Sequence, residues 1–256
     1  MQPEEMENTF SQCKSLHLSR VDLSRKGSID DDIYPVVSLL NNSPNYFTTS
    51  SCSGRVIVID GLSETSEIQK QNCSWLFVTH QKCSEEDVIS GLRNSRGSAV
   101  FKFEPFVLHV QCKDITSARL LLSVAVQSGF RNSGVSIGKR DKIILAVRST
   151  HCLEVPLSHT GEIMVNEKYI HFLVQAANQK MTENLHRIKR FYAGVQAALQ
   201  SDESSCTTNL NHPSKKRHCK QASEKKQDSM IEQNRFPSNK LGDPEDYFED
   251  GLALFS

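Results

Sequence analysis

Apolar residues recur along the first 200 positions of the chain in two patterns, one typical of strands and one typical of helices. Short apolar runs between polar turns predict strands at 47–50, 56–59, 74–80, 99–112 and within 132–149. Apolar residues at helical spacing predict helices at 28–42, 84–95, 114–129 and 166–200. Strands outnumber helices and follow one another without strict alternation. We therefore expect an α+β fold: a single compact domain, residues 1–200, with a mixed, largely antiparallel sheet and flanking helices, not a doubly wound sheet.

Local signals at the ends of these segments predict several boundaries. In two places a serine precedes an aspartate by three residues, the pattern of a capping box at a helix start: Ser28 with Asp31, and Ser84 with Asp87. Gly129 suits the C-terminal cap of the helix before it. Pro105 lacks the N–H that an interior ladder needs, so the stretch 99–112 predicts two strands broken at this proline.

Composition and charge are those of a globular protein that stays inside the cell. The chain has 256 residues, with 30 basic and 30 acidic side chains. It has no run of the roughly 18 apolar residues that a membrane span requires, and its acidic N-terminus does not resemble a secretory signal. We expect cytoplasmic localisation, with the nucleus as an alternative, no membrane partner, and cysteines that are thiols. Residues 201–256, Ser-rich and then acidic, predict a disordered tail.

The stretch FTTSSCSGR, residues 47–55, is crowded with small hydrogen-bonding groups directly before the apolar run VIVID. We expect Ser51–Arg55 to form a bend between two strands. Backbone N–H groups at such a bend bind anions, and hydroxyls extend the site. Arg55 could fork onto a carboxylate or a phosphate. The alternative, a turn without a ligand, is about equally well supported by these residues.

A second polar bend lies at GFRNSG, residues 129–134, and a basic hairpin follows it. Between Arg131 and Arg148 there are five basic residues and one acid. Trp75 and the phenylalanines of 101–106 are candidates to face a planar ligand, although core positions suit them as well. Together these features favour a nucleotide or RNA site.

Two matched pairs, His80-x-x-Cys83 and His109-x-x-Cys112, have residue types that bind zinc. Both pairs fall on or just after predicted strands, where residues three apart point to opposite faces. We therefore expect buried thiols and no metal, with a zinc-stapled interaction protein as a minor alternative.

Seven segments resemble the tRNA-wybutosine-synthesising protein 3 family, in the same order and over about residues 13–200: DLSRKGSID, FTTSSCSGR, WLFVTH, KFEPFVLHVQC, SGFRNSG, AVRSTHCLEVPL and NQKMTENLHRIKRFY. The resemblance implies an S-adenosyl-L-methionine-dependent methyltransferase that lacks the usual methyltransferase fold. Its substrate would be a ring nitrogen, N4, of the tricyclic wybutosine precursor 3′ to the anticodon of phenylalanine tRNA. Other enzymes of the wybutosine pathway are possible partners, and the oligomeric state is left open.

Carried onto this chain, the family motifs and the chemistry of the residues together predict three groups. The catalytic pair, as candidate bases, is His80 and His109. The cofactor-binding residues, which would hold the methionine carboxylate, are Ser50, Ser51, Ser53, Gly54 and Arg55. The substrate-binding residues are Lys26, Trp75, Arg131, Asn132, Ser133, Lys139, Arg140 and Arg148. A non-catalytic tRNA-binding module would also explain the basic hairpin.

Overall fold

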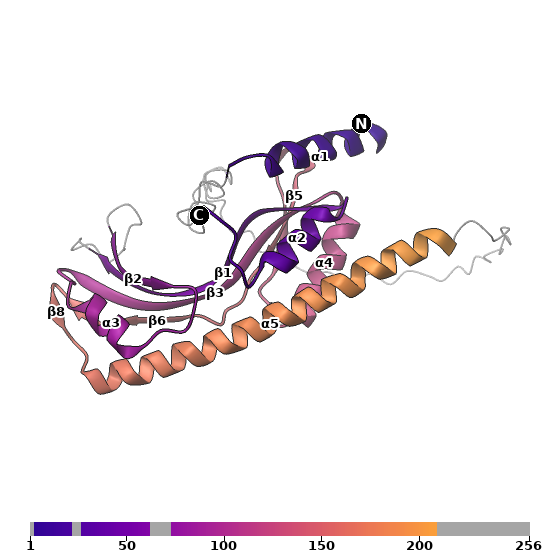
Figure 1. The fold of residues 1–256 in the computed structure, drawn as a ribbon. Coiled ribbons are helices and arrows are strands. Elements are labelled where there is room, and N and C mark those ends of the chain that lie inside the picture. Colours follow the sequence, from indigo (N-terminus) through magenta and orange to yellow (C-terminus); the bar gives the residue numbers. More distant parts are fainter. Residues whose placement is uncertain (1–2, 22–26, 62–72, 209–256) are drawn as a thin grey trace, which may run out of the picture.

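The protein is a curved antiparallel sheet with helices on both faces (Figure 1). The computed structural model describes residues 3–21, 27–61 and 73–208, so Lys26 and the predicted tail from 209 onward lie outside the described residues. Helices α2, α3, α4 and α5 pack on one face, and α1 lies against the other. Every strand pairing in the described part of the chain is antiparallel, which confirms the α+β class and makes the sheet less mixed than the sequence predicts.

The six-stranded sheet has the order β2-β1-β3-β5-β4, and β6 pairs with the other end of β3. Its strands are β1 (Tyr46–Gly61), β2 (Cys73–Thr79), β3 (Ser98–Cys112), β4 (Gly134–Ile137), β5 (Ile143–Val147) and β6 (Leu153–Pro156). The small hairpin β7 (Ser158–His159) and β8 (Glu162–Ile163) stands apart. The predicted β4–β5 hairpin is confirmed, with the 3-10 turn η2 (Lys139–Asp141) at its tip.

The helices are α1 (Pro3–Leu18), α2 (Tyr34–Asn42), α3 (Glu85–Leu92), α4 (Ile115–Gln127) and α5 (Glu167–Thr208). The capping box at Ser84 is confirmed, and Gly129 takes the left-handed conformation just beyond α4 (φ +105°). The predicted start at Ser28 is wrong, because α2 begins at Tyr34 and has Pro35 in its first turn, where a proline costs no hydrogen bond. In the part of the chain that the structure describes, no helix is long and apolar enough to cross a membrane.

Two predicted strand breaks are wrong, because β1 and β3 are continuous through the middle of the sheet. Residues 51–55 are part of β1, and Pro105 lies within β3 directly opposite Gly54. Gly54 has φ +104°, a conformation that other residues rarely adopt. The neighbouring pair, Ser53 and Phe106, is missing from the ladder, and its backbone groups bond to side chains from other parts of the molecule.

The side chain of Asn184, on α5, completes the sheet at this point. Its Oδ1 accepts the N–H of Phe106 (2.8 Å), and its Nδ2 donates to the carbonyl of Ser53 (2.7 Å). A Cβ on Gly54 would lie 2.8 Å from Asn184 Nδ2 and 3.0 Å from the carbonyl of Glu104, so a larger residue does not fit. A polar side chain with 1% exposure thus bridges the backbone groups of Ser53 and Phe106, which are not paired with each other in the ladder.

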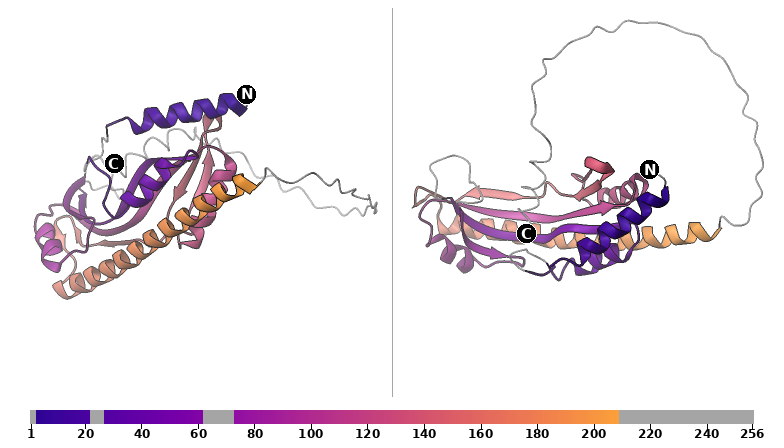
Figure 2. Two further views of the ribbon diagram at one scale, coloured as in Figure 1. Left: turned by 45° about the vertical axis from the view of Figure 1, so that its right-hand side comes forward. Right: turned by 90° about the horizontal axis from the view of Figure 1, so that it is seen from above.

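The long helix α5 runs along one face of the sheet (Figure 2). It contributes side chains to two hydrophobic cores on that face. Ala177 and Met181 pack in the core beside α3, whereas Ile188 and Phe191 pack in the core beside α2 and α4. Asn184 lies between the two sets. The helix continues to Thr208, eight residues beyond the end predicted for it at 200.

Candidate active site

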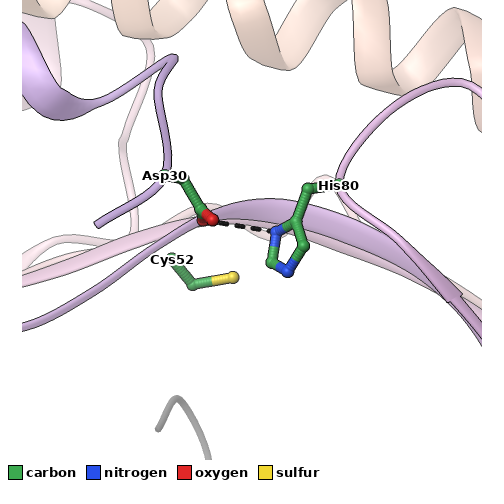
Figure 3. Close-up of side chains that lie close together, drawn as sticks. All are labelled: Asp30, Cys52 and His80. Atoms are coloured by element: carbon green, nitrogen blue, oxygen red, sulfur yellow. Dashed lines mark ion pairs between the residues drawn. The ribbon is translucent and has the colours of Figure 1, made fainter. Parts of the chain in front are cut away.

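Three side chains meet at the edge of β1, where β2 no longer pairs with it (Figure 3). Asp30, in the segment before α2, accepts the backbone N–H of Ser53 through Oδ2 (2.9 Å). The same oxygen lies 3.2 Å from His80 Nδ1, and that nitrogen is 3.0 Å from the carbonyl of Gly54. Asp30 and His80 therefore satisfy backbone groups of β1 that have no strand partner. We call Asp30, Cys52 and His80 the edge cluster.

The edge cluster is strongly polarised. The hydrogen bond to Asp30, followed by the contact with Cys52, raises the pKa of His80 from 6.5 to about 10. His80 is therefore an imidazolium at neutral pH and has already taken up the proton that a general base would accept. The three ligand atoms lie within 4.8 Å of one another, close enough to share a metal ion, which would have to displace the proton of His80.

A second histidine lies across β1, on the face of the sheet opposite α5. His109 on β3 has its Nδ1 2.8 Å from the hydroxyl of Ser50 and its Nε2 2.9 Å from Arg148 Nη2. Ser133 accepts the backbone N–H of Arg148 (3.1 Å). A chain of hydrogen bonds thus joins the serine-rich stretch of β1 to the predicted second motif. We call Ser50, His109, Arg148 and Ser133 the face cluster.

The partners of His109 determine its tautomer. A guanidinium can only donate, so Nε2 must be the unprotonated nitrogen, and the N–H on Nδ1 then donates to Ser50. Burial, followed by the charge of Arg148, lowers the pKa of His109 from 6.5 to about 4. His109 is therefore neutral at pH 7, and the hydroxyl proton of Ser50 is left available to a ligand.

Arg55 is buried and is not exposed beside a bend. It is 7% exposed, its Nε donates to Glu104 (2.6 Å), and its guanidinium lies 4.8 Å from the ring centre of Trp75. The same ion pair and stacking contact hold Arg55 and Trp75 in place together. The serine-rich stretch is an extended strand with a left-handed glycine, so an anion site made from a tight turn is not present there.

The predicted substrate residues fall into two groups. Arg131 and Asn132 are exposed and line a cavity near α5, and Ser133 connects to Arg148. Lys139 and the backbone of Arg140 lie at the tip of the β4–β5 hairpin. The tip is at the opposite end of the hairpin from Gly134. The structure therefore joins the 131–133 segment to the face cluster but does not bring the hairpin tip to it.

The two zinc-like pairs do not converge. Cys83 and Cys112 pack in the two different hydrophobic cores, and burial raises the pKa of the Cys83 thiol to about 11 and that of Cys112 to about 12. His80 and His109 lie instead in the edge and face clusters. Cys13, Cys52, Cys73, Cys83, Cys112 and Cys152 are free thiols.

Three residues at the site are absent from the catalytic, cofactor-binding and substrate-binding groups that the sequence predicts: Asp30, Cys52 and Asn184. Asp30 lies 22 residues before Cys52 and 50 before His80, and only the fold brings them together. Asn184 comes from a helix far along the chain. Cys52 lies inside the serine-rich motif, but its role as a neighbour of His80 depends on the strand conformation that the sequence did not predict.

Comparison with known proteins gives this site its context. The family described as Methyltransferase TYW3 matches residues 9–197, which include all the described residues of both clusters. The chain belongs to this family. The resemblance identified from the seven sequence segments is therefore confirmed, and the chain is a methyltransferase.

Relatives of this TYW3 methyltransferase come from animals and plants. The chain is 60% identical over 200 residues to the zebrafish (Danio rerio) tRNA wybutosine-synthesizing protein 3 homolog, and the alignment covers 78% of this chain and 80% of that protein. The human protein of the same name is 55% identical over 204 residues, and the alignment covers 80% of this chain and 77% of the human protein. The Arabidopsis thaliana tRNA wybutosine-synthesizing protein 2/3/4 is 37% identical over 69% of this chain and 19% of that protein.

Solved structures of archaeal proteins share the fold. The PH1069 protein from Pyrococcus horikoshii has a TM-score of 0.68 and 32% identity, covering 74% of this chain and 97% of that one. A hypothetical protein from Aeropyrum pernix has a TM-score of 0.58 and 25% identity, covering 67% of this chain and 99% of that one. The alignments therefore take in almost all of each archaeal chain but only about two thirds to three quarters of this one.

Proposed function

We propose that this TYW3 methyltransferase uses S-adenosyl-L-methionine to methylate ring nitrogen N4 of the tricyclic wybutosine precursor, 3′ to the anticodon of phenylalanine tRNA. The role in wybutosine synthesis follows from the family and from the names of its relatives. The meeting of the edge and face clusters on one stretch of β1 is the observation that carries the proposal. Ser50 and Cys52 lie on β1 itself, and the other side chains of the two clusters converge on this stretch from the segment before α2 and from the chain beyond β1.

The donors on this stretch fit the amino-acid end of the cofactor. S-adenosylmethionine, when bound, supplies a methyl group whose bond to sulfur breaks as the bond to the acceptor nitrogen forms. The hydroxyl of Ser50 is free to donate because it accepts from His109. The ring of His80 is cationic, and its Nε2 points away from Asp30 (Figure 3). A carboxylate bound by a hydroxyl and an imidazolium is stabilised by charge-assisted hydrogen bonds.

The two histidines then have different parts in the reaction. His80 holds a positive charge beside Asp30 and fixes the backbone of Ser53 and Gly54. His109 is neutral, so it is the histidine that can accept the proton that the acceptor nitrogen loses. Its lone pair points at Arg148, which is exposed and can turn to a phosphate of the substrate. A weak base suffices, because a ring nitrogen that has just gained a methyl group is acidic.

Positioning is the larger contribution of the protein. Methyl transfer requires the two reacting atoms in line at about 3–3.5 Å. The continuous strands β1 and β3, which Asn184 bridges, fix the positions of the side chains that would hold the two reactants. The tRNA, whose unpaired base would be turned out of the anticodon loop, supplies the acceptor.

The test is methyl transfer from labelled S-adenosylmethionine to phenylalanine tRNA that carries the unmethylated precursor. Ser50→Ala and Asp30→Asn are compared with Ser136→Ala, a serine on β4 outside both clusters. We expect wild-type protein and the Ser136 variant to label the tRNA, and both site variants to lose at least about tenfold in rate because a charge-assisted hydrogen bond is lost. Tight tRNA binding by the wild type without methyl transfer would support the non-catalytic module instead.

A further inference from the structure

A polar cavity of about 480 Å³ lies beside α5, outside the edge and face clusters. It is lined by Gln127, Ser128, Gly129, Arg131, Asn132, Ser149, Thr150, Arg187 and Arg190. The lining contains no aliphatic or aromatic residue. We propose that this cavity binds a backbone phosphate of the tRNA substrate, an inference that rests on the proposed function.

The charge of the cavity favours an anion. Glu183 accepts from Arg187 Nε (2.9 Å) and Arg190 Nη2 (3.1 Å), so one carboxylate is shared by two guanidinium groups. These contacts lower the pKa of Glu183, which stays ionised. Arg131 adds a third guanidinium, which is exposed and, among the described residues, has no charged or hydrogen-bonded partner. Three cations against one anion leave a net positive charge for a ligand.

Two of the arginines are held in place before any ligand binds. Arg187 Nη1 donates to Ser149 Oγ (3.0 Å) and to the carbonyl of Gly129 (3.4 Å). Arg190 Nε donates to the carbonyl of Ser128 (3.3 Å). A guanidinium fixed in this way binds a phosphate with little further loss of side-chain entropy, and its planar fork matches two phosphate oxygens.

The chemistry of the lining selects sugar-phosphate over a base. An adenine or another nucleobase needs an apolar or aromatic wall to stack on, and this lining offers only polar side chains and glycine. A cavity of this size exceeds the needs of one phosphate group, and the hydroxyls and amide of Thr150, Ser149 and Asn132 suit the ribose beside it.

The position of the cavity fits a substrate that also reaches the face cluster. Ser149 and Thr150 line the cavity, whereas the preceding residue, Arg148, donates to His109. Arg187 lies three residues after Asn184, which holds the strand that carries Ser53. A phosphate in the cavity would therefore anchor an RNA strand next to the hydrogen-bond chain that ends at Ser50.

The experiment measures tRNA affinity over a salt series for wild type, Arg131→Gln and Arg190→Gln, with Arg119→Gln as control. Arg119 is an exposed arginine near the other end of α4 and does not line the cavity. Each cavity variant should weaken binding about tenfold and reduce the salt slope by about 0.7, the contribution of one single-strand phosphate contact, whereas the control should match wild type. S-adenosylmethionine affinity should be unchanged in all three variants.

Salt slopes in the cavity variants equal to that of the control would overturn the inference while leaving the proposed function intact. Weaker S-adenosylmethionine binding in Arg131→Gln would also overturn it, by assigning the cavity to the cofactor. A wild-type protein that neither binds nor methylates the tRNA would refute the proposed function, and this inference with it.

Discussion

His80 and His109 lie on opposite sides of the same strand stretch and take opposite charge states. His80 meets a buried carboxylate, and the pKa rises to about 10; His109 is more deeply buried beside a guanidinium, and the pKa falls to about 4. The residue type is the same, so the difference comes from the partners that the fold provides. A family motif that contains a histidine therefore does not say whether that histidine is an acid, a base or a fixed charge.

The two clusters also respond to pH in opposite directions. His80 has a raised pKa in the folded state, so its stabilisation is complete below about pH 6.5 and is lost as pH rises through about 10. His109 has a lowered pKa, so the folded state loses stability as pH falls from about 6.5 through about 4. The variants below separate these contributions, beginning with the one that disturbs both clusters.

The largest effect is expected from Asn184→Leu, which removes the side chain that completes the sheet between β1 and β3. The N–H of Phe106 and the carbonyl of Ser53 would both be buried without a partner, at about 1–3 kcal/mol each. We expect a loss of about 4 kcal/mol in the free energy of unfolding, measured by urea denaturation.

Met181→Leu is the matched control for this variant, since Met181 is buried one turn earlier on α5 and the swap nearly conserves volume. It should cost less than about 1.5 kcal/mol. Equal losses in the two variants would mean that packing of α5, and not the two hydrogen bonds, holds the middle of the sheet.

A smaller effect is expected from Asp30→Asn, which disturbs the edge cluster alone. The variant loses the ion pair with His80 but can still accept from Ser53, so we expect a cost of about 2 kcal/mol at pH 6 to 7. Because His80 is neutral at high pH even in the wild type, the cost should shrink toward pH 10. Urea denaturation at several pH values measures it, and a cost that is constant with pH would show that His80 is not charged.

The smallest effect on stability is expected from Arg148→Met, which changes the face cluster. Arg148 is exposed, so the loss should stay below about 1 kcal/mol. The pKa of His109 should rise from about 4, although burial, its larger cause, should keep it below 6.5. Histidine NMR signals followed over pH measure this change, with Arg119→Met as control. An unchanged pKa would show that burial alone keeps His109 neutral.

The sequence predicted what local chemistry determines. The capping box of Ser84 and Asp87 and the glycine after α4 act within a few residues, and both predictions are confirmed. The break at Pro105 is wrong because β3 continues through it. The unpaired backbone groups of Ser53 and Phe106 beside it are bridged by Asn184, 79 residues from Pro105, and no local rule contains that partner. The motif residues of β1 were found, but the charge of each histidine depends on Asp30 and Arg148, which only the fold brings close.

The pH dependence of single-turnover methyl transfer distinguishes His109 from His80 as the proton acceptor. If His109, which is neutral throughout this range, accepts the proton, the rate constant should stay level between about pH 6 and 9. A rate that climbs through pH 9 toward about 10 would contradict the account, since it would make deprotonated His80 the base.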